Sequence, residues 1–343
     1  MSDVPPSLTL SAAQPPFYVG VDIGGTNVKI GLVDDLGRTI TDLCIPTGVE
    51  AGPDSTSRRI GAAMLQMISE IGLAPTYIAR VGLVTPGWQD MQNGLILAPH
   101  NLPNWHGFPI RERVSQYCGL PVTFANDANA AAFGESWVGA GREFRTLVLL
   151  TLGTGIGGGI ILEDYTVQGE NGHGAECGHI VIDYHPNARV CGCGQTGHLE
   201  AYASATAVIK RTSEALESGR KSSLIERMNN HDELTPILIC EEAEAGDALS
   251  LEIILETARF IGIGAVSLIH TIDPTGVLLG GAMTFGGESS PLGRRFLDEV
   301  RAEVRRRNLP GSAARTRIEF AALGGNAGYI GAAGLARFEY RRK

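Results

Sequence analysis

Apolar residues near the start of the chain alternate with polar ones instead of following helical spacing. The alternation predicts strands at 17–23 and 28–34, joined by the glycine-rich turn 24–27. The same plan recurs at 146–162, where two apolar runs flank the glycine-rich segment 153–159. Further strands are expected at 38–45, 78–84, 121–125, 275–279 and 317–321, and helices at 57–71, 111–118, 127–138, 199–218, 251–271, 291–308 and 327–337.

Strands and helices alternate through both halves, which predicts an α/β fold of two lobes with related beginnings. We expect a flexible tail at 1–16, a small lobe at 17–125 and a large lobe at 126–325. A helix at 326–340 is expected to pack back on the small lobe.

Glycine is unusually frequent, with 45 among 343 residues, about twice its average share in globular proteins. The glycines follow no three-residue period, which excludes collagen. With 28 basic and 37 acidic residues, the net charge is −9. This balance does not fit a nucleic-acid partner, and the arginines at 301–307, which lie among glutamates, are interpreted as a solvated helix face.

The cysteines and the apolar stretches indicate in which cellular compartment the protein is expected. The longest apolar stretch, 260–269, is shorter than the roughly twenty residues that cross a bilayer, and residues 1–16 lack the pattern of a secretory signal. We therefore expect a cytoplasmic protein with no membrane partner. Cys191 and Cys193 lie close together, whereas the other cysteines are scattered and are expected to be small core residues: Cys44, Cys118, Cys177 and Cys240.

The first hairpin turn has the composition of a phosphate-binding loop. Gly24 and Gly25 let backbone N–H groups approach a phosphate, Thr26 adds a hydroxyl, and Asp22 is suited to hold a magnesium-bound water. A plain hairpin turn accounts for the same residues equally well.

The second glycine-rich segment fits two kinds of nucleotide site. Gly153, Gly155 and Gly158 match G-x-G-x-x-G, which raises the alternative of an NAD-dependent dehydrogenase. That motif needs a helix after the glycines, whereas 159–162 continues as an apolar, β-branched run. The segment therefore favours a second phosphate-binding hairpin.

Asp127 comes where a predicted strand ends and a predicted helix begins. Local sequence favours a helix cap. The two phosphate-like hairpins favour a general base that accepts a proton from an alcohol attacking phosphorus.

Four potential zinc ligands lie within one irregular segment of little apolar content: His179, Cys191, Cys193 and His198. Two imidazoles and two thiolates form a normal tetrahedral zinc set, with His185 as an alternative ligand. Glu176 and Glu200 flank the group and are suited to accept hydrogen bonds from sugar hydroxyls. A glycine-rich loop with incidental cysteines is the competing interpretation.

In combination, these motifs resemble the ROK family of sugar kinases, within the actin, hexokinase and Hsp70 fold group. The resemblance runs from about residue 17 to residue 338. The matching segments are the two phosphate motifs at 22–27 and 152–159, the catalytic motif at 126–129, the zinc and sugar signature at 176–200, the adenosine-side loop at Gly280-Gly281-Ala282, and the sugar-cleft loops at Pro86-Gly87 and 101–105.

The resemblance implies a two-lobed actin-like ATPase fold of the ribonuclease H type, with a cleft between the lobes. It also implies transfer of the ATP γ-phosphate to a hexose hydroxyl, usually at C6, with Asp127 as the base and Mg²⁺ as the catalytic metal. The implied sugar contacts are Pro86, Gly87, Asn101, Asn126, Asp127, Glu176, His179 and Glu200. The implied ATP and phosphate contacts are Asp22, Gly24, Gly25, Thr26, Asn27, Lys29, Gly153, Thr154, Gly155, Gly280 and Gly281. A structural Zn²⁺ is implied at His179, Cys191, Cys193 and His198, where His198 replaces a cysteine of the family.

Glucose is the expected substrate, and N-acetylmannosamine, N-acetylglucosamine and fructose are the alternatives. A sugar-sensing repressor of the same family would carry an N-terminal winged-helix domain, and about sixteen residues before the first strand are too few for one. A dehydrogenase is the other distant alternative. The expected partners are a sugar, a nucleotide and further copies of the chain, in a homodimer or homotetramer.

Overall fold

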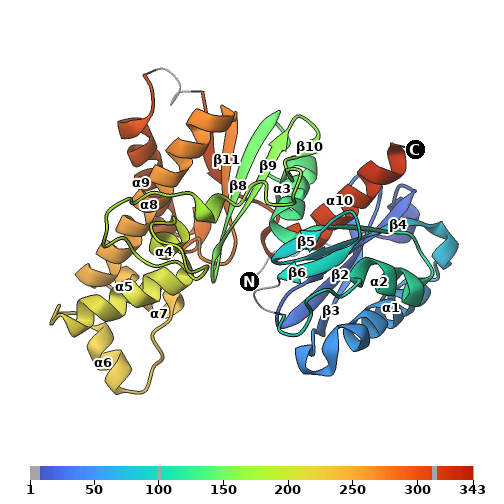
Figure 1. The fold of residues 1–343 in the computed structure, drawn as a ribbon, viewed down its shortest axis with the longest axis horizontal. Coiled ribbons are helices and arrows are strands. Elements are labelled where there is room, and N and C mark those ends of the chain that lie inside the picture. The colour runs from blue at the N-terminus through green and yellow to red at the C-terminus, as the bar shows by residue number, and fades with distance from the viewer. Residues whose placement is uncertain (1–7, 99–101, 311–314, 343) are drawn as a thin grey trace. The chain divides into compact units, whose positions relative to one another are not determined.

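The computed structural model describes residues 8–98, 102–310 and 315–342 (Figure 1). Internal contacts divide the chain into two compact units. Unit 1 comprises the described residues of Met1–Glu143, Gly159–Ala175 and Gly325–Lys343, and unit 2 comprises those of Phe144–Gly158 and Glu176–Gly324.

Unit 1 is built on a five-stranded sheet in the order β3-β2-β1-β4-β7. Its strands are β1 (Phe17–Ile23), β2 (Asn27–Val33), β3 (Thr39–Pro46), β4 (Ile78–Thr85) and β7 (Val122–Asn126). β1 is antiparallel to β2 and parallel to β4, and β4 is parallel to β7. A separate two-stranded sheet consists of β5 (Trp88–Asp90) and β6 (Leu95–Ala98).

Helices cover both faces of this sheet (Figure 1). They are α1 (Gly52–Glu70), α2 (Ile110–Cys118), α3 (Asp127–Val138) and α10 (Ala327–Arg341). Val19, Val21 and Ile23 share one buried cluster with apolar residues of α1 and α2. Because side chains alternate along a strand, Gly20 and Asp22 lie on the opposite face, where α10 packs.

Helix α10 lies directly on the sheet because two strand positions have no side chain. A Cβ on Gly20 would be 1.8 Å from the carbonyl oxygen of Tyr329, and one on Gly82 would be 1.9 Å from that of Ala332. Gly331 of α10 is equally close to the backbone of α3. These close backbone contacts explain part of the high glycine content.

Unit 2 contains most of a second sheet, in the order β10-β9-β8-β11-β12. Its strands are β8 (Thr146–Leu152), β9 (Ile156–Leu162), β10 (Tyr165–Thr166), β11 (Gly276–Gly280) and β12 (Arg317–Phe320). From Gly159 onward β9 is grouped with unit 1, and so is β10. The helices of unit 2 are α4 (Glu200–Ala203), α5 (Ala205–Glu217), α6 (Leu224–Asn229), α7 (Pro236–Glu244), α8 (Ala248–Ile272) and α9 (Pro291–Arg307).

Helix α8 is the central helix of unit 2. With 25 residues it is long and apolar enough, by length and composition, to span a membrane. The uninterrupted apolar stretch within it, 260–269, is much shorter than the helix. In its most apolar window 61% is buried inside the protein, and the helix packs against α5, α7 and α9. This burial is typical of a core helix.

The strands and helices expected from apolar periodicity are found, with ends that differ by up to five residues. The helix expected at 199–218 is broken at Ser204, whose hydroxyl accepts a hydrogen bond from the N–H of Ala207 and so caps α5. Short elements of weak periodicity were not predicted: β5, β6, β10, α6 and α7.

Three segments differ from the lobes and tail expected from the sequence. Residues 126–143 and 159–175 are grouped with unit 1. The described part of the expected flexible tail is held to β2 and its turn: the N–H of Gln14 donates to Asp34 at 3.1 Å, and Arg38 donates to the carbonyl of Ala12 at 3.0 Å.

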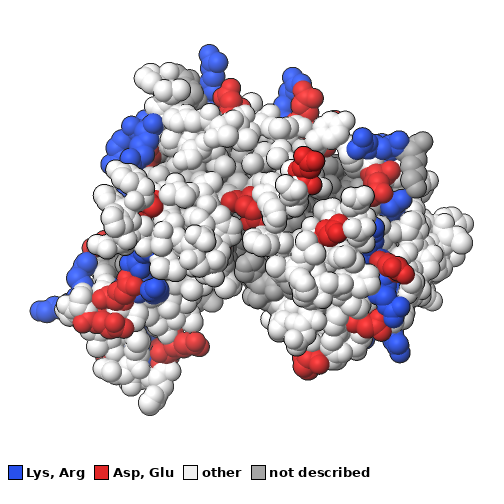
Figure 2. Space-filling model, viewed as in Figure 1, with Lys and Arg blue, Asp and Glu red and all other residues white. Residues whose placement is uncertain are grey.

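Charged side chains of both signs are interspersed over the face drawn in Figure 2. In α9, Arg306 and Arg307 both pair with the buried Glu303. Paired arginines of this kind fit the interpretation of 301–307 as a solvated helix face.

Candidate functional site

Three parallel strands of unit 1 end in polar residues at the same edge of the sheet. β1 ends beside Asp22, β4 at Thr85 and β7 at Asn126, and Thr85 is paired with Asn126 in the sheet register. Ligands of open α/β sheets bind at this carboxyl edge, where loops and helix starts converge. The first glycine turn and the start of α3 both lie there.

The start of α3 tests one of the two roles that the sequence allowed for Asp127, that of helix cap. The cap is Asn126: its Oδ1 accepts hydrogen bonds from the N–H groups of Ala128 at 2.9 Å and Asn129 at 3.1 Å. Its amide nitrogen donates to the carbonyl of Gly87 at 3.4 Å. Asp127 lies in the first helical turn, where Oδ1 accepts from the N–H of Ala128 at 2.8 Å. The local preference for Asp127 as the N-cap was wrong, because the neighbouring asparagine is an equally good cap.

Asp22 lies close to a second carboxylate and to a lysine. Burial and the charge of Asp127 raise the pKa of Asp22 to about 7, and Lys29, its cross-strand neighbour, opposes this rise. The Lys29 ammonium donates to the carbonyl of Gly325 at 2.6 Å, and a Cβ on Gly328 would be 2.1 Å from Oδ2 of Asp22. Two neighbouring carboxylates of which one resists ionisation favour a bound cation.

Asp22→Asn is expected to stabilise the ligand-free protein at pH 8. Between its ordinary pKa of 3.8 and about 7, Asp22 binds more protons in the folded than in the unfolded chain. Its contribution to stability therefore falls as the pH rises through this range, by at most about 4 kcal/mol. Melting temperatures of both proteins from pH 4 to pH 8 test this, and parallel curves would contradict it.

The second glycine hairpin, between β8 and β9, packs on the start of α5. The N–H of Gly153 donates to the carbonyl of Gly155 at 3.0 Å and closes the turn. The carbonyl of Gly153 accepts from the N–H of Ala205 at 2.9 Å, and that of Thr154 accepts from the hydroxyl of Thr206 at 2.9 Å. Strand β9 follows these glycines where a dinucleotide motif needs a helix, so the structure contradicts the dehydrogenase alternative.

The loop after β11 lies against the same hairpin. Gly281 has φ +88°, and a Cβ there would be 2.3 Å from the carbonyl oxygen of Leu152. The N–H of Met283 donates to that same oxygen at 3.0 Å. Gly280 and Gly281, expected at the adenosine, thus lie at the end of β8, next to Gly153.

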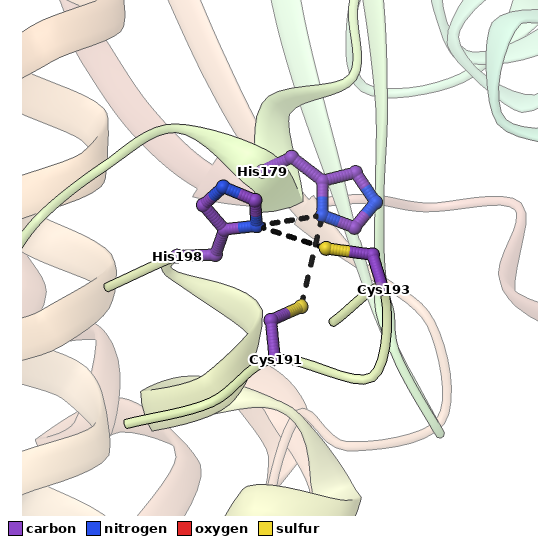
Figure 3. A group of neighbouring side chains, drawn as sticks. All are labelled: His179, Cys191, Cys193 and His198. Atoms are coloured by element: carbon purple, nitrogen blue, oxygen red, sulfur yellow. Dashed lines mark hydrogen bonds between the residues drawn. The ribbon is translucent and has the colours of Figure 1, made fainter. Parts of the chain in front are cut away.

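Figure 3 shows the four potential zinc ligands turned toward one another in unit 2. The ligand atoms lie within 4.8 Å of one another, and they belong to His179, Cys191, Cys193 and His198. The two imidazole Nδ1 atoms are 3.2 Å apart, and the nitrogen–sulfur distances are 3.8 Å for His179 to Cys191 and 3.3 Å for His198 to Cys193. A zinc tetrahedron with ordinary bond lengths has nitrogens about 3.3 Å apart and nitrogen–sulfur pairs about 3.6 Å apart. The donor set therefore fits zinc in both chemistry and spacing. His185 does not join the group and stacks on Tyr184.

Two glutamates connect this cluster to its surroundings. Oε2 of Glu176 is 3.9 Å from Nε2 of His179, the ring nitrogen that faces away from the cluster. Glu200 accepts from the thiol of Cys191 at 3.3 Å and from the N–H of Ile156 at 2.9 Å. A Cβ on Gly155 would be 2.3 Å from Glu200, so this glycine makes room for the carboxylate. Glu200 thereby links the zinc-ligand cluster to the second glycine hairpin.

The remaining four cysteines were expected in the core, but they differ in burial. Cys118 and Cys177 are buried, and burial raises the pKa of the Cys177 thiol to about 12, as expected for a core thiol. Cys240 is partly buried. Cys44 is exposed, so its prediction as a core residue was wrong, because it occupies an outward position on the edge strand β3.

Asn101, expected at the sugar, lies outside the described residues. Two glycines close to Asp22 and Lys29 were not predicted as site residues from the sequence. Gly325 and Gly328 contact Lys29 and Asp22, yet the sequence indicated only a helix of small residues there. The glycine pair 324–325, one residue before the helix, was the available signal for the first of them.

The features expected of an actin-like sugar kinase are present: two α/β units, two glycine hairpins and a carboxylate at a helix start. The expected fold class is confirmed by solved structures of ROK kinases with this fold. The chain belongs to the ROK family, whose model matches residues 18–339.

Its relatives include both enzymes and regulators. A glucokinase of Thermotoga maritima is 33% identical over 93% of this chain and 96% of its own. A ROK glucokinase of Streptomyces griseus, solved with glucose and AMPPNP, has a TM-score of 0.76 and 34% identity over 94% of this chain and 99% of its own. A xylose repressor of Caldicellulosiruptor bescii is 29% identical over 91% of this chain and 76% of its own.

Proposed function

We propose that this protein transfers the γ-phosphate of ATP to the C6 hydroxyl of glucose. The observation that carries the proposal is the pair of carboxylates, Asp22 and Asp127, at the ligand-binding edge of the unit 1 sheet. Glucokinases align with nearly the whole chain, and the Streptomyces griseus neighbour was solved with glucose and a nucleotide analogue.

Asp127 is the general base of the proposed reaction. It accepts the proton of the C6 hydroxyl while that oxygen forms a bond to the γ-phosphorus and the bond to the leaving ADP breaks. The cap at Asn126 and the Ala128 N–H hold Asp127 at the start of α3. The carboxylate is thus oriented before substrate arrives.

Asp22 and the first hairpin bind the phosphates of ATP in the proposed reaction. A magnesium ion bound with ATP offsets phosphate charge, and Asp22 is suited to hold one of its waters because a cation removes the penalty on its ionisation. The N–H groups of Gly25, Thr26 and Asn27 donate to phosphate oxygens, and Lys29 adds positive charge beside them. Gly24 shapes this loop, because its N–H donates to the carbonyl of Asn27 at 2.9 Å and closes the hairpin.

Unit 2 supplies the other groups of the proposal. Thr154 and Gly155 donate backbone hydrogen bonds to phosphate beside Gly153, whose own N–H closes the turn, and Gly280 and Gly281 contact the adenosine. The proposed sugar contacts of this unit are Glu176, His179 and Glu200; those of unit 1 are Pro86, Gly87 and Asn126, beside Asp127. Polar groups paired with hydroxyls in this way give epimer discrimination of ~10⁴-fold or more.

Zinc is proposed as a structural ion held by His179, Cys191, Cys193 and His198. Four protein ligands complete a tetrahedron and leave no open coordination position for catalysis. The carboxylate of Glu176 near the outer nitrogen of His179 has the arrangement that orients zinc-bound histidines. Zinc would thereby fix the loop that bears Glu176 and Glu200.

An ADP-release assay across hexoses tests the proposed function. Glucose is expected to give the highest kcat/KM with ATP, above N-acetylmannosamine, N-acetylglucosamine, fructose and mannose, and polyphosphate is compared as donor. A higher value for an acetamido sugar would reject glucose as the preferred substrate, and no phosphorylation of any hexose would reject the kinase activity.

We also propose that the protein is a cytoplasmic homodimer or homotetramer. Light scattering of the purified protein tests its assembly.

A further inference from the structure

Unit 1 presents an exposed aromatic pair next to the residues that hold the base. Trp88 and His173 meet edge to face, with ring centroids 4.9 Å apart and planes at 76°. Trp88 directly follows Gly87, whose carbonyl accepts from Asn126, the neighbour of Asp127. The backbone before the indole is therefore tied to the start of α3.

The exposure of Trp88 sets it apart from a structural tryptophan. Its relative exposure is 41%, whereas Trp105 is fully buried. An indole carries one of the largest apolar surfaces of any side chain, and leaving it in water is unfavourable unless a partner covers it. Trp88 therefore has apolar surface available for a ligand.

The strand that bears Trp88 is firmly held. Gln89, buried, donates from Nε2 to the carbonyl of Thr85 at 2.6 Å and to its hydroxyl at 2.9 Å. Asp90 closes the following turn by accepting from the N–H and the side chain of Asn93. The exposed indole thus sits on an ordered support and is not part of a loose loop, which lowers the entropy lost when it binds a ligand.

A hexose ring matches this surface chemically. Pyranoses carry hydroxyls at their edge and C–H groups on their faces, so an aromatic side chain covers a face while polar residues bind the edge. Glucose has an equatorial hydroxyl at C2, C3 and C4, so neither face is interrupted by an axial hydroxyl at these carbons. Mannose and galactose each have one axial hydroxyl there.

We propose that Trp88, supported by His173, stacks on the face of the hexose and selects for equatorial hydroxyls. The inference rests on the proposed phosphorylation of a hexose and adds a specificity-determining residue to that site. Stacking holds substrate and transition state alike, so Trp88 affects KM more than kcat.

Steady-state kinetics with Trp88→Ala and Trp88→Phe test the stacking. Trp88→Ala is expected to raise the KM for glucose about 10-fold with kcat changed less than about 2-fold. It is also expected to lower the preference for glucose over mannose in kcat/KM about 10-fold, and Trp88→Phe to recover part of both. Trp137→Phe, at the far end of α3, is the matched control and keeps the values of the unmodified protein.

A direct binding experiment separates this inference from the proposed reaction. The chain has three tryptophans, and glucose added without ATP is expected to change the fluorescence of the unmodified protein and of Trp137→Phe, but not of Trp88→Phe. Unchanged KM and selectivity in Trp88→Ala, or a full glucose signal in Trp88→Phe, would overturn the stacking while leaving the kinase intact. If no hexose is phosphorylated, the proposed function fails and the fluorescence titration alone decides whether Trp88 contacts a sugar.

Discussion

Replacing Asp127 with asparagine is expected to lower kcat by about 10²- to 10⁴-fold. An amide has nearly the same shape as the carboxylate but cannot accept the proton of the attacking hydroxyl. The helix keeps its cap, because Asn126 provides it, so the melting temperature should stay within a few degrees. ADP release under saturating ATP and glucose measures the loss.

The exposed carboxylate of Asp42 on β3 offers the matched control. Asp42→Asn removes the same charge from the same unit, away from the carboxyl edge of the sheet, and should keep full turnover. Glucose binding by Asp127→Asn, followed by calorimetry, should persist. Turnover within about 3-fold of the unmodified enzyme would remove Asp127 from the role of base.

Removing the proposed zinc is the second large change, with an expected loss of activity of about 10- to 100-fold. The segment from Glu176 to Leu199 has no regular strand, and Val181, Tyr184 and Val190 are exposed. With few apolar contacts to hold the segment, the metal would fix the positions of Glu176 and Glu200. Elemental analysis is expected to find about one zinc per chain, and chelation should lower both activity and melting temperature.

Cys193→Ser should reproduce the effect of chelation, because it removes one ligand without changing side-chain size. Cys44→Ser, an exposed thiol in unit 1, is the control and should retain zinc and activity. A purified protein without metal that has full turnover, and whose melting temperature zinc does not change, would refute the structural zinc.

The parts of the fold that could be predicted from the sequence are those encoded by patterns of neighbouring residues. Period-two alternation identified both glycine hairpins, and the spacing of apolar residues identified helices such as α1 and α8. The grouping of the four residues proposed as zinc ligands was also predicted, because their residue types are rare and lie within one short segment. In each case the signal lies within about twenty-five residues.

What the sequence did not show depends on contacts between distant segments. The pKa of Asp22 depends on burial and on Asp127, which follows more than a hundred residues later. The edge contact of Trp88 with His173 joins segments that no motif connects. The choice of Asn126 over Asp127 as the cap is a local matter, but two good caps side by side cannot be ranked without backbone geometry.

During synthesis, unit 1 cannot complete its core until α10 has left the ribosome. The positions of Gly20 and Gly82, made early, stay without the helix that covers them while all of unit 2 is translated. Unit 2, whose last residue is Gly324, precedes α10 and has its own helices and strands to fold first. The protein should therefore assemble in the reverse of the usual N-terminal-first order, with unit 1 completed last.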